Sequence, residues 1–282
     1  MEIRPLSSIS FDEVLASFLQ AFENYFVKMP TDKPYYENRW KAAKVDWDAS
    51  YGMFDQSQLV GFIIHAIDRR NQLLTAFNTG TGVIPAYRGK RIIQSIYTHA
   101  LKDLAQRGIQ RTTLEVITDN HIAVRLYQGV GFEIVKKYIC FKGTLPILDI
   151  PTPSLRELKK EAIDWDALPN QDKYSWDNQQ ESIVEGDYRY FQVLHEGEAE
   201  SFFIIQPAQH YVAQLDLLQE KNQSWDRLFA GIRQISPAMK INNVDNRLTE
   251  KIHQLQRMGL EHTVDQYEME LEIEKISSPS SA

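Results

Sequence analysis

The sequence has little cysteine, no long apolar run and no excess of basic charge. Its 282 residues include one cysteine, Cys140, which excludes an internal disulfide and makes the cytoplasm the expected location. We expect neither secretion nor a membrane-spanning helix, because no apolar run precedes a cleavage site and none reaches about 18 residues. The formal net charge of −7 argues against a nucleic-acid surface and slightly favours a basic partner such as an amine.

The sequence also lacks the residue patterns of a metal site and of a catalytic cysteine. The seven histidines show no paired ligand spacing, so we predict no metal site. Cys140 lies in a strand-like run with no identifiable His or Asp partner, which favours a small buried hydrophobe over a nucleophile. What the sequence does have is 43% apolar residues and about twice the length of a common domain, which predicts two domains with sizeable cores.

A strand, a basic turn and a long helix form the most informative segment. Residues 73–83 are rich in strand-forming residues, but Gly80 and Gly82 predict a bulge or the close approach of a ligand. Residues 88–91 (Arg-Gly-Lys-Arg) then lead into a helix predicted over residues 93–107. N–H groups at a helix N-terminus lack partners and the helix dipole is positive there, so this turn predicts a seat for a phosphate. The alternative is an ordinary polar turn whose basic side chains are only solvated.

A second strand and helix follow downstream. Residues 112–117 are a β-type run, residues 118–120 (Thr-Asp-Asn) are a helix-capping signal, and residues 122–132 have helical spacing. Residues three or four positions apart lie along one side of such a helix, and here they are Asn120, Ala123, Tyr127 and Gly131. Tyr127 therefore faces the same surroundings as the other three.

At these positions the sequence resembles the GCN5-related N-acetyltransferase (GNAT) superfamily. The phosphate turn of that family is similar to Val83-x-Pro85-x-Tyr87-Arg88-Gly89-Lys90, and its later signature is similar to Leu114-Glu115-Val116 followed by Asn120-x-x-Ala123-x-x-Leu126-Tyr127-x-x-x-Gly131-Phe132. The resemblance covers residues 1–145 and implies an α/β fold in which a mixed β-sheet is flanked by helices. One departure is that Arg91 and Ile93 stand where the family has small residues.

The resemblance implies an enzyme that transfers the acetyl group of acetyl-CoA (coenzyme A) to a primary amine by direct attack through a tetrahedral intermediate. The diphosphate would lie on the main-chain N–H groups of residues 88–93, the pantetheine arm would pair with the strand near Val83, and Asn120 would contact that arm. The cofactor-binding residues that it implies are Val83, Arg88, Gly89, Lys90, Arg91, Ile92, Ile93 and Asn120.

The same resemblance implies catalytic roles for Tyr127 and Glu115. Tyr127 would be the general acid for the departing sulfur, since tyrosine, with an ordinary pKa of about 10, is protonated at neutral pH. Glu115 would be the general base, acting through water, with alternatives at Glu37, Asp46 and Asp48. A backbone N–H near Val83 would stabilise the oxyanion. The structural alternatives are a core tyrosine on an apolar stripe and an ordinary outward-facing strand glutamate.

The rest of the first half fits this architecture. We predict a strand over residues 1–7, a helix over residues 11–26, a second helix over residues 34–44, and a hairpin of residues 51–54 and 59–67. The second helix carries three aromatic residues that are either core or an acceptor wall, namely Tyr35, Tyr36 and Trp40.

The second half resembles a faint copy of the first, after a proline-rich linker over residues 146–154. The copy, over residues 155–276, has a hairpin, a further strand, a helix at 224–235, and a strand and helix ending near Gly259, with Leu255 where Tyr127 stands. Its turn at residues 219–223 has no glycine and no arginine, so we infer a degenerate acetyltransferase-like domain that has lost its phosphate seat. Trp176 and Asn178 either reach the cleft or serve as core and cap, and residues 277–282 are a frayed tail.

The leading function is therefore N-acetylation of a small molecule or a peptide amine, by a monomer or a homodimer. Two alternatives stay open, a non-catalytic acyl-CoA-binding sensor or regulator and an aminoacyl-type transferase. The first is motivated by Arg91 and Ile93 in the phosphate turn.

Overall fold

A computed structural model describes residues 1–23 and 26–273 and divides the chain into two units. Among the described residues, the first unit consists of residues 1–23, 26–116, 120–135 and 268–273, and the second of residues 117–119 and 136–267. The predicted tail at residues 277–282 lies outside the described residues.

The sheet of the first unit is antiparallel at one side and parallel in its middle. In sheet order its strands are β1 (Glu2–Pro5), β2 (Tyr51–Asp55), β3 (Gln58–Arg70), β4 (Leu73–Val83), β5 (Arg111–Ile117) and the last residues of β12 (Glu261–Glu272). Each neighbouring pair from β1 to β4 is antiparallel, whereas β4 and β5 run parallel. A parallel pair needs a crossover connection, which is the helix α3 (Ile92–Gln106).

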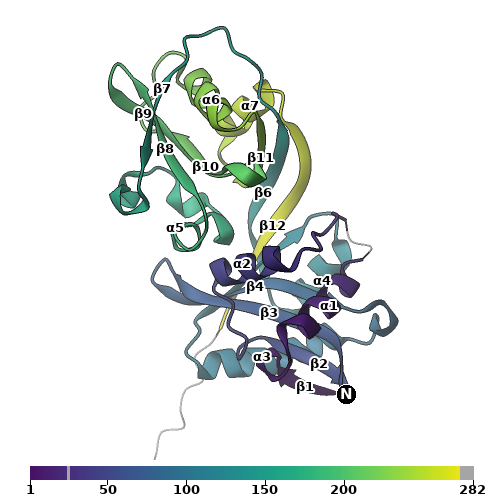
Figure 1. Cartoon of the computed structure of the whole chain (residues 1–282). Coiled ribbons are helices and arrows are strands. Elements are labelled where there is room, and N and C mark those ends of the chain that lie inside the picture. The colour runs from purple at the N-terminus through teal and green to yellow at the C-terminus, as the bar shows by residue number, and fades with distance from the viewer. Residues whose placement is uncertain (24–25, 274–282) are drawn as a thin grey trace, which may run out of the picture. The chain divides into compact units, whose positions relative to one another are not determined.

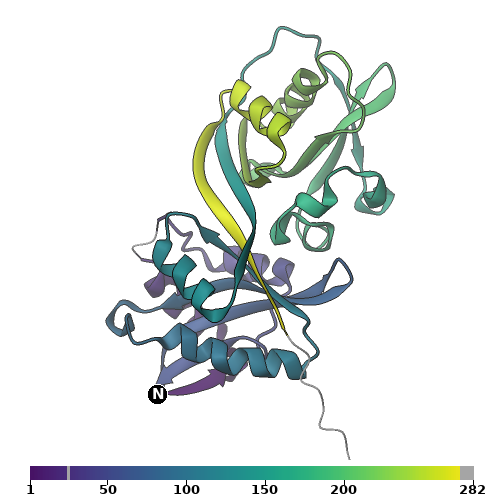
Figure 2. The same cartoon turned by 180° about the vertical axis from the view of Figure 1, so that it is seen from behind.

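Four helices cover the two faces of this sheet. The helices α1 (Phe11–Ala21) and α2 (Lys33–Ala43) lie on one face, and α3 and α4 (His121–Val130) on the other (Figures 1 and 2). The surroundings of two glycines agree with this arrangement. On one face of the sheet, a Cβ added to Gly80 would contact Phe18 of α1, and on the other face, a Cβ added to Gly61 would contact Ile92 of α3.

The sequence sets where the first helices begin and end. Ser10 caps α1 in a capping box with Glu13, and Asp32 caps α2. The first helix ends at Ala21, earlier than the predicted residue 26, and residues 24 and 25 lie outside the described range. Tyr36 and Trp40 are buried in the core with Phe18, so these two residues are core and the acceptor-wall alternative is wrong for them, whereas Tyr35 is partly buried and packs against the same core.

The second unit repeats the order of elements of the first. Its strands in sheet order are β7 (Ser154–Leu158), β8 (Arg189–His195), β9 (Glu198–Gln206), β10 (Tyr211–Leu217), β11 (Ala238–Asp245), β6 (Glu133–Thr144) and the first residues of β12. The pairs from β7 to β10 are antiparallel, and β10 and β11 are parallel around the helix α6 (Ser224–Ile235). The helix α7 (Thr249–Arg257) follows β11, as α4 follows β5.

The repeated order confirms the prediction of two similar domains in tandem, each with a mixed sheet flanked by helices. Both units also have a register shift in the strand before the crossover helix, in β4 opposite Ile64 and His65 and in β10 between Val212 and Gln214. Short 3₁₀ turns and the helix α5 (Gln180–Ile183) lie between β7 and β8, where the sequence predicts a helix that begins at Trp176 and Asn178.

The two units exchange a strand. The strand that follows α4, β6, has its residues from Lys136 onward in the second unit and pairs antiparallel with β11 there. The strand that follows α7, β12, returns residues from Glu268 onward to the first unit, where Ile273 donates its N–H to the carbonyl of Gln110. The sequence-based boundary at residue 145 and the linker at 146–154 therefore differ from the observed division, since both lie within the second unit.

Candidate active site in the first unit

The parallel strands β4 and β5 separate halfway along β4. Their pairing begins at Thr75 and Arg111 and ends at Asn78 and Leu114. Thr79 is an extra residue in β4, because Asn78 lies opposite His65 whereas Gly80 lies opposite Ile64. This is a β-bulge, which bends a strand away from its neighbour and confirms the bulge predicted from the glycines.

The end of β4 presents free backbone groups to the gap. Ile84 donates its N–H to the carbonyl of Val60 on β3. Since N–H groups alternate in direction along a strand, those of Val83 and Thr81 point the other way, toward the side that β5 has left. An extended ligand can therefore pair with this edge as an additional strand.

The basic turn leads to the N-terminus of α3, which has no side-chain cap. Asp32 and Asn120 cap the helices α2 and α4, whereas Arg91 at the N-cap of α3 makes no such bond. Arg88 and Ser95 donate their N–H groups to Pro85 and Arg91, but no backbone acceptor is found for residues 89–94 in the described part of the chain. These N–H groups and the positive end of the helix dipole form a place for an anion.

Two residues in this turn have left-handed backbone angles. Gly89 has φ of +78° with open space where a side chain would be, and Arg91 has φ of 56°. The left-handed region is costly for residues other than glycine, which explains why a small residue is expected at the position of Arg91. Ile92 and Ile93 are buried and anchor the start of the helix in the core.

The side chain of Arg88 braces the turn. Its Nε donates to the carbonyl of Val83 at 3.3 Å and its Nη2 to the carbonyl of Ala21 at 3.0 Å. Its own N–H donates to Pro85 at 3.3 Å, so the available main-chain donors begin at Gly89. Lys90 lies over the ring of Tyr87, 4.4 Å from its centroid, and is exposed.

The helix α4 places Asn120 and Tyr127 as the sequence predicts. Asn120 is the N-cap, and its Oδ1 accepts the N–H of Ala123 at 3.2 Å, which leaves its amide nitrogen for other partners. Tyr127 is 8% exposed and packs edge-on against Tyr97 of α3 and against Phe132, with ring centroids 6.2 and 5.9 Å apart. Its ring is therefore part of the core.

Glu115 is the first residue of β5 beyond the last pair with β4. Because side chains alternate along a strand, Glu115 shares a face of the sheet with Thr113 and Phe77, opposite to the face that carries Asn78 and α3.

The alternative general bases, Asp46 and Glu37, make other contacts. Asp46 accepts the N–H groups of Asp48 and Ala49 within its own turn, at 2.9 and 3.0 Å. Glu37 is an exposed residue of α2, at 3.9 Å from Lys33.

A buried polar cluster beside the bulge has no counterpart in the sequence-based site. Asn78 is 5% exposed, and its Nδ2 lies 2.6 Å from both the Thr81 hydroxyl and the Tyr97 hydroxyl. His65 lies opposite Asn78 on β3, fully buried, with Nδ1 at 2.7 Å from the carbonyl of Ala49. Burial lowers the pKa of His65 to about 4. The polar run around Gly80 and Gly82 is the sequence signal that could have pointed here.

The equivalent place in the second unit is bridged by the protein itself. The strands β10 and β11 pair only at Tyr211 and Lys240, and Asn178 bonds to both strands where they diverge. It accepts the Tyr211 hydroxyl at 2.6 Å, donates to the carbonyl of Asn242 at 3.2 Å, and accepts at its carbonyl from Gln214 at 2.7 Å. Asn178 is 1% exposed, so it belongs to the core.

A buried ion pair lies next to that bridge. Lys251 of α7 is 2.8 Å from Asp216 of β10, and Asn170 donates to the same carboxylate oxygen at 2.8 Å. Burial lowers the pKa of Lys251, and Asp216 opposes this effect. The turn before α6, residues 219–223, has one acidic residue, Glu220, and one basic residue, Lys221, whereas the turn before α3 has three basic residues, Arg88, Lys90 and Arg91. The second unit therefore lacks both the open edge and the basic turn.

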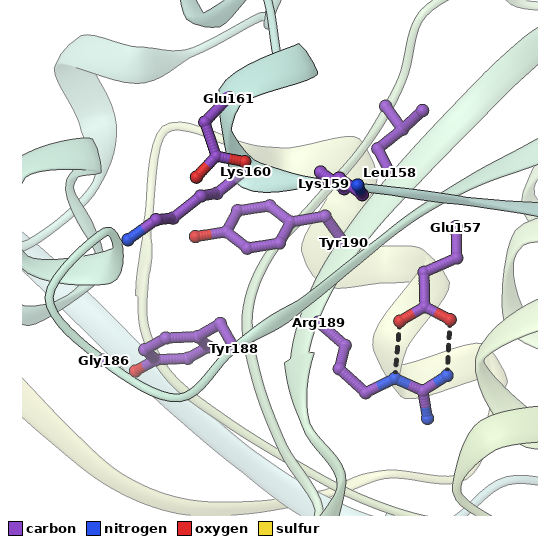
Figure 3. Close-up of a pocket in the computed structure, with 9 residues that line it drawn as sticks. All are labelled: Glu157, Leu158, Lys159, Lys160, Glu161, Gly186, Tyr188, Arg189 and Tyr190. Carbon is purple, nitrogen blue, oxygen red and sulfur yellow. Dashed lines mark hydrogen bonds and ion pairs between the residues drawn. The ribbon is translucent and has the colours of Figure 1, made fainter.

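A pocket of about 380 Å³ lies elsewhere in the second unit, beside the edge strand β7 (Figure 3). Glu157 and Arg189 neutralise each other at one end of it through two bonds of 2.8 and 2.7 Å. The Tyr190 ring is 5% exposed and packs against Trp165. Its nine lining residues include no cysteine and no histidine, and we assign it no catalytic role.

Comparison with known proteins agrees with this geometry. Residues 15–132 match the sequence profile of the acetyltransferase (GNAT) family. Mycothiol acetyltransferase of Corynebacterium efficiens is 27% identical over 136 residues, which is 46% of this chain and 45% of that protein. An N-alpha-acetyltransferase of Arabidopsis thaliana is 30% identical over 84 residues, 30% of this chain and 44% of that protein. The chain thus spans less than half the length of these two relatives.

Solved structures extend the likeness in fold to the whole chain. A tandem GNAT protein from the clavulanic acid biosynthesis pathway has a TM-score of 0.66 at 13% identity, covering 97% of this chain and 98% of that one. No helix within residues 1–23 and 26–273 has the length and apolar character needed to cross a bilayer. The open edge of β4 and the uncapped helix α3 both lie within residues 15–132, the part of the chain that matches the acetyltransferase (GNAT) profile.

Proposed function

We propose that the first unit is an N-acetyltransferase that uses acetyl-CoA and a primary amine of a small molecule or a peptide. The observation that carries the proposal is the open edge of β4 next to the uncapped N-terminus of α3. An acyl thioester with a diphosphate needs both, since the arm requires strand-like backbone partners and the phosphates require N–H donors. Within the described residues, the open strand edge and the uncapped helix N-terminus lie next to each other in the first unit.

The donor supplies an activated acetyl group, and the protein holds it and moves protons. The N–H groups from Gly89 to Ile93 bind the diphosphate, the N–H of Val83 pairs with the arm, and the amide nitrogen of Asn120 donates to it. Lys90 and Arg91 add positive charge at this end. Arg88 contributes by fixing the turn rather than by contacting the ligand.

Two side chains carry the proton transfers. The attacking amine must lose a proton, which Glu115 takes through a water molecule. When the carbon–sulfur bond breaks and the carbon–nitrogen bond has formed, Tyr127 gives its hydroxyl proton to the sulfur and regains one from solvent. The N–H of Gly80, next to the bulge, is not free for the acetyl oxygen, because it donates to Oδ1 of Asn78 at 3.1 Å. The expected oxyanion donor near Val83 is therefore the N–H of Thr81, since the N–H of Val83 pairs with the arm.

Substitution of Gly89 tests the phosphate seat against a matched control in the same helix. Gly89→Glu places a carboxylate over the N–H groups and should weaken acetyl-CoA binding at least tenfold in calorimetry. Gly108→Glu is the control, since Gly108 at the other end of α3 has nearly the same φ, +77°, and equally open surroundings. Equal affinities for the two variants would remove the seat from this turn.

Turnover separates an enzyme from a sensor of acyl-CoA. The purified protein should release free thiol from acetyl-CoA when a library of primary amines and peptides is added, and should release none without an amine. Tight binding with no thiol release over the whole library would favour the non-catalytic alternative.

A further inference from the structure

Asn78, Thr81 and Tyr97 form a closed polar cluster beside the gap between β4 and β5. The Asn78 side chain donates through Nδ2 to the Thr81 hydroxyl and to the Tyr97 hydroxyl, both at 2.6 Å. Tyr97 is 1% exposed and Asn78 is 5% exposed, so neither side chain is solvated. The cluster ties the helix α3 to the bulged part of β4.

The orientation of the Asn78 amide is fixed by its third contact. A backbone N–H can only donate, and the N–H of Gly80 lies 3.1 Å from the other amide atom, which must therefore be the oxygen Oδ1. The atom that faces Thr81 and Tyr97 is then the NH2 group. Both hydroxyl oxygens accept from it.

This polarity leaves one hydroxyl proton without an acceptor inside the cluster. Thr81 and Tyr97 each have one O–H, and if one donates to the other, the second proton still needs a partner outside the cluster. Apart from the cluster itself, no acceptor for the Tyr97 hydroxyl is found among residues 1–23 and 26–273. Thr81 is only partly buried whereas Tyr97 is 1% exposed, so the arrangement in which Thr81 donates to Tyr97 leaves a buried proton for a neighbour outside the cluster.

Tyr127 is the aromatic neighbour of Tyr97 on α4. Their rings meet edge to face at 89° with centroids 6.2 Å apart. Burial first, and then the proximity of Tyr127, raise the pKa of Tyr97 well above its usual range, so Tyr97 remains a donor.

We propose that Asn78, Thr81 and Tyr97 position Tyr127 and stabilise its oxygen through the surplus hydroxyl proton after Tyr127 has given its own proton to the sulfur. The proposal rests on the general-acid role in the proposed function. In that step the O–H bond of Tyr127 breaks, an S–H bond forms, and the resulting phenolate accepts a hydrogen bond until solvent reprotonates it. Tyr97 is a positioning residue, since it acts through Tyr127.

Tyr97→Phe removes the hydroxyl and keeps the ring. We expect kcat to fall about tenfold, because a hydrogen bond to a developing charge is lost, while the KM for acetyl-CoA stays within twofold. In the Tyr127→Phe background the same substitution should have no further effect. A second readout needs no ligand: in protein labelled with ¹³C at the tyrosine ζ carbon, the Tyr127 resonance should shift in Tyr97→Phe.

Two more variants test whether the direction of the Asn78–Tyr97 hydrogen bond matters. Asn78→Asp reverses that direction, and Tyr51→Phe is the control for losing a buried tyrosine hydroxyl. Asn78→Asp turns the donor into an acceptor, so the Tyr97 proton points to the new carboxylate and the Tyr127 resonance and kcat should change as in Tyr97→Phe. Tyr51 is 2% exposed and its hydroxyl bonds to Asp103, on the same α3 side of the sheet. Tyr51→Phe should leave kcat and the Tyr127 resonance unchanged.

Different results overturn different statements. If the unmodified protein releases no thiol, the proposed function fails. If it does, but Tyr97→Phe leaves kcat and the Tyr127 resonance unchanged, or the two tyrosine substitutions have additive effects, the positioning role fails while the function stands.

Discussion

The buried imidazole of His65 should make the first unit acid-labile. His65 is fully buried on β3 and bonds through Nδ1 to the carbonyl of Ala49 at 2.7 Å, so Nδ1 carries the proton. Its Nε2 has no hydrogen-bond partner among the described residues. Protonation would place a cation there with no acceptor, which is why burial lowers its pKa to about 4.

The size of the effect follows from the difference between the folded and unfolded pKa values. The unfolded chain takes up the proton near pH 6.5 and the folded unit only near pH 4, so acid favours the unfolded state between these values. Stability from this residue is present above pH 6.5 and is lost as the pH falls. By pH 4 the loss amounts to about 3 kcal/mol of the free energy of unfolding.

His65→Asn isolates this contribution. The asparagine amide can still donate to the carbonyl of Ala49, but it does not titrate, and carboxylates elsewhere behave alike in both proteins. The free energy is best measured locally, by hydrogen exchange of β3 amides from pH 7.5 to pH 4. The stability of the unmodified protein relative to His65→Asn should fall by about 3 kcal/mol over that range. Parallel pH profiles would refute the reasoning.

Two further predictions concern one residue in each unit. Tyr127→Phe keeps the packing of the ring and should lower kcat by about 100-fold with acetyl-CoA affinity within twofold in calorimetry; an unchanged kcat would remove the general-acid role. Asp216→Ala leaves Lys251 buried without its partner and should cost about 3 kcal/mol in the stability of β10 measured by hydrogen exchange. Asp226→Ala breaks the exposed pair with Arg257 and should cost at most about 1 kcal/mol, so equal losses for both variants would contradict the assignment.

The elements of the fold could largely be predicted because their signals are local. Apolar spacing marks α1 in the sequence, a capping signal marks α4, and the glycines of β4 mark its bulge. The motif residues Glu115 and Tyr127 also lie on the predicted strand and helix. Their chemical roles stay predictions, since a motif gives position and not proton transfer.

The polar cluster could not be predicted because it depends on register. Whether Asn78 faces Tyr97 is decided by one extra residue in β4, and a shift of one residue turns every side chain to the opposite face. His65 was missed for the same reason, since its partner across the strand pair is set by that bulge. The exchange of β6 and β12 was missed because both read as strands and the sequence does not say which neighbour each will pair with.

The path of β12 has a consequence for the order in which a nascent chain matures. The stretch that finishes the sheet of the first unit, residues 268–272, is synthesised after everything the second unit needs. On the ribosome the unit that is made first is therefore completed last, and until then β5 has a bare edge that chaperones or foreign strands can reach.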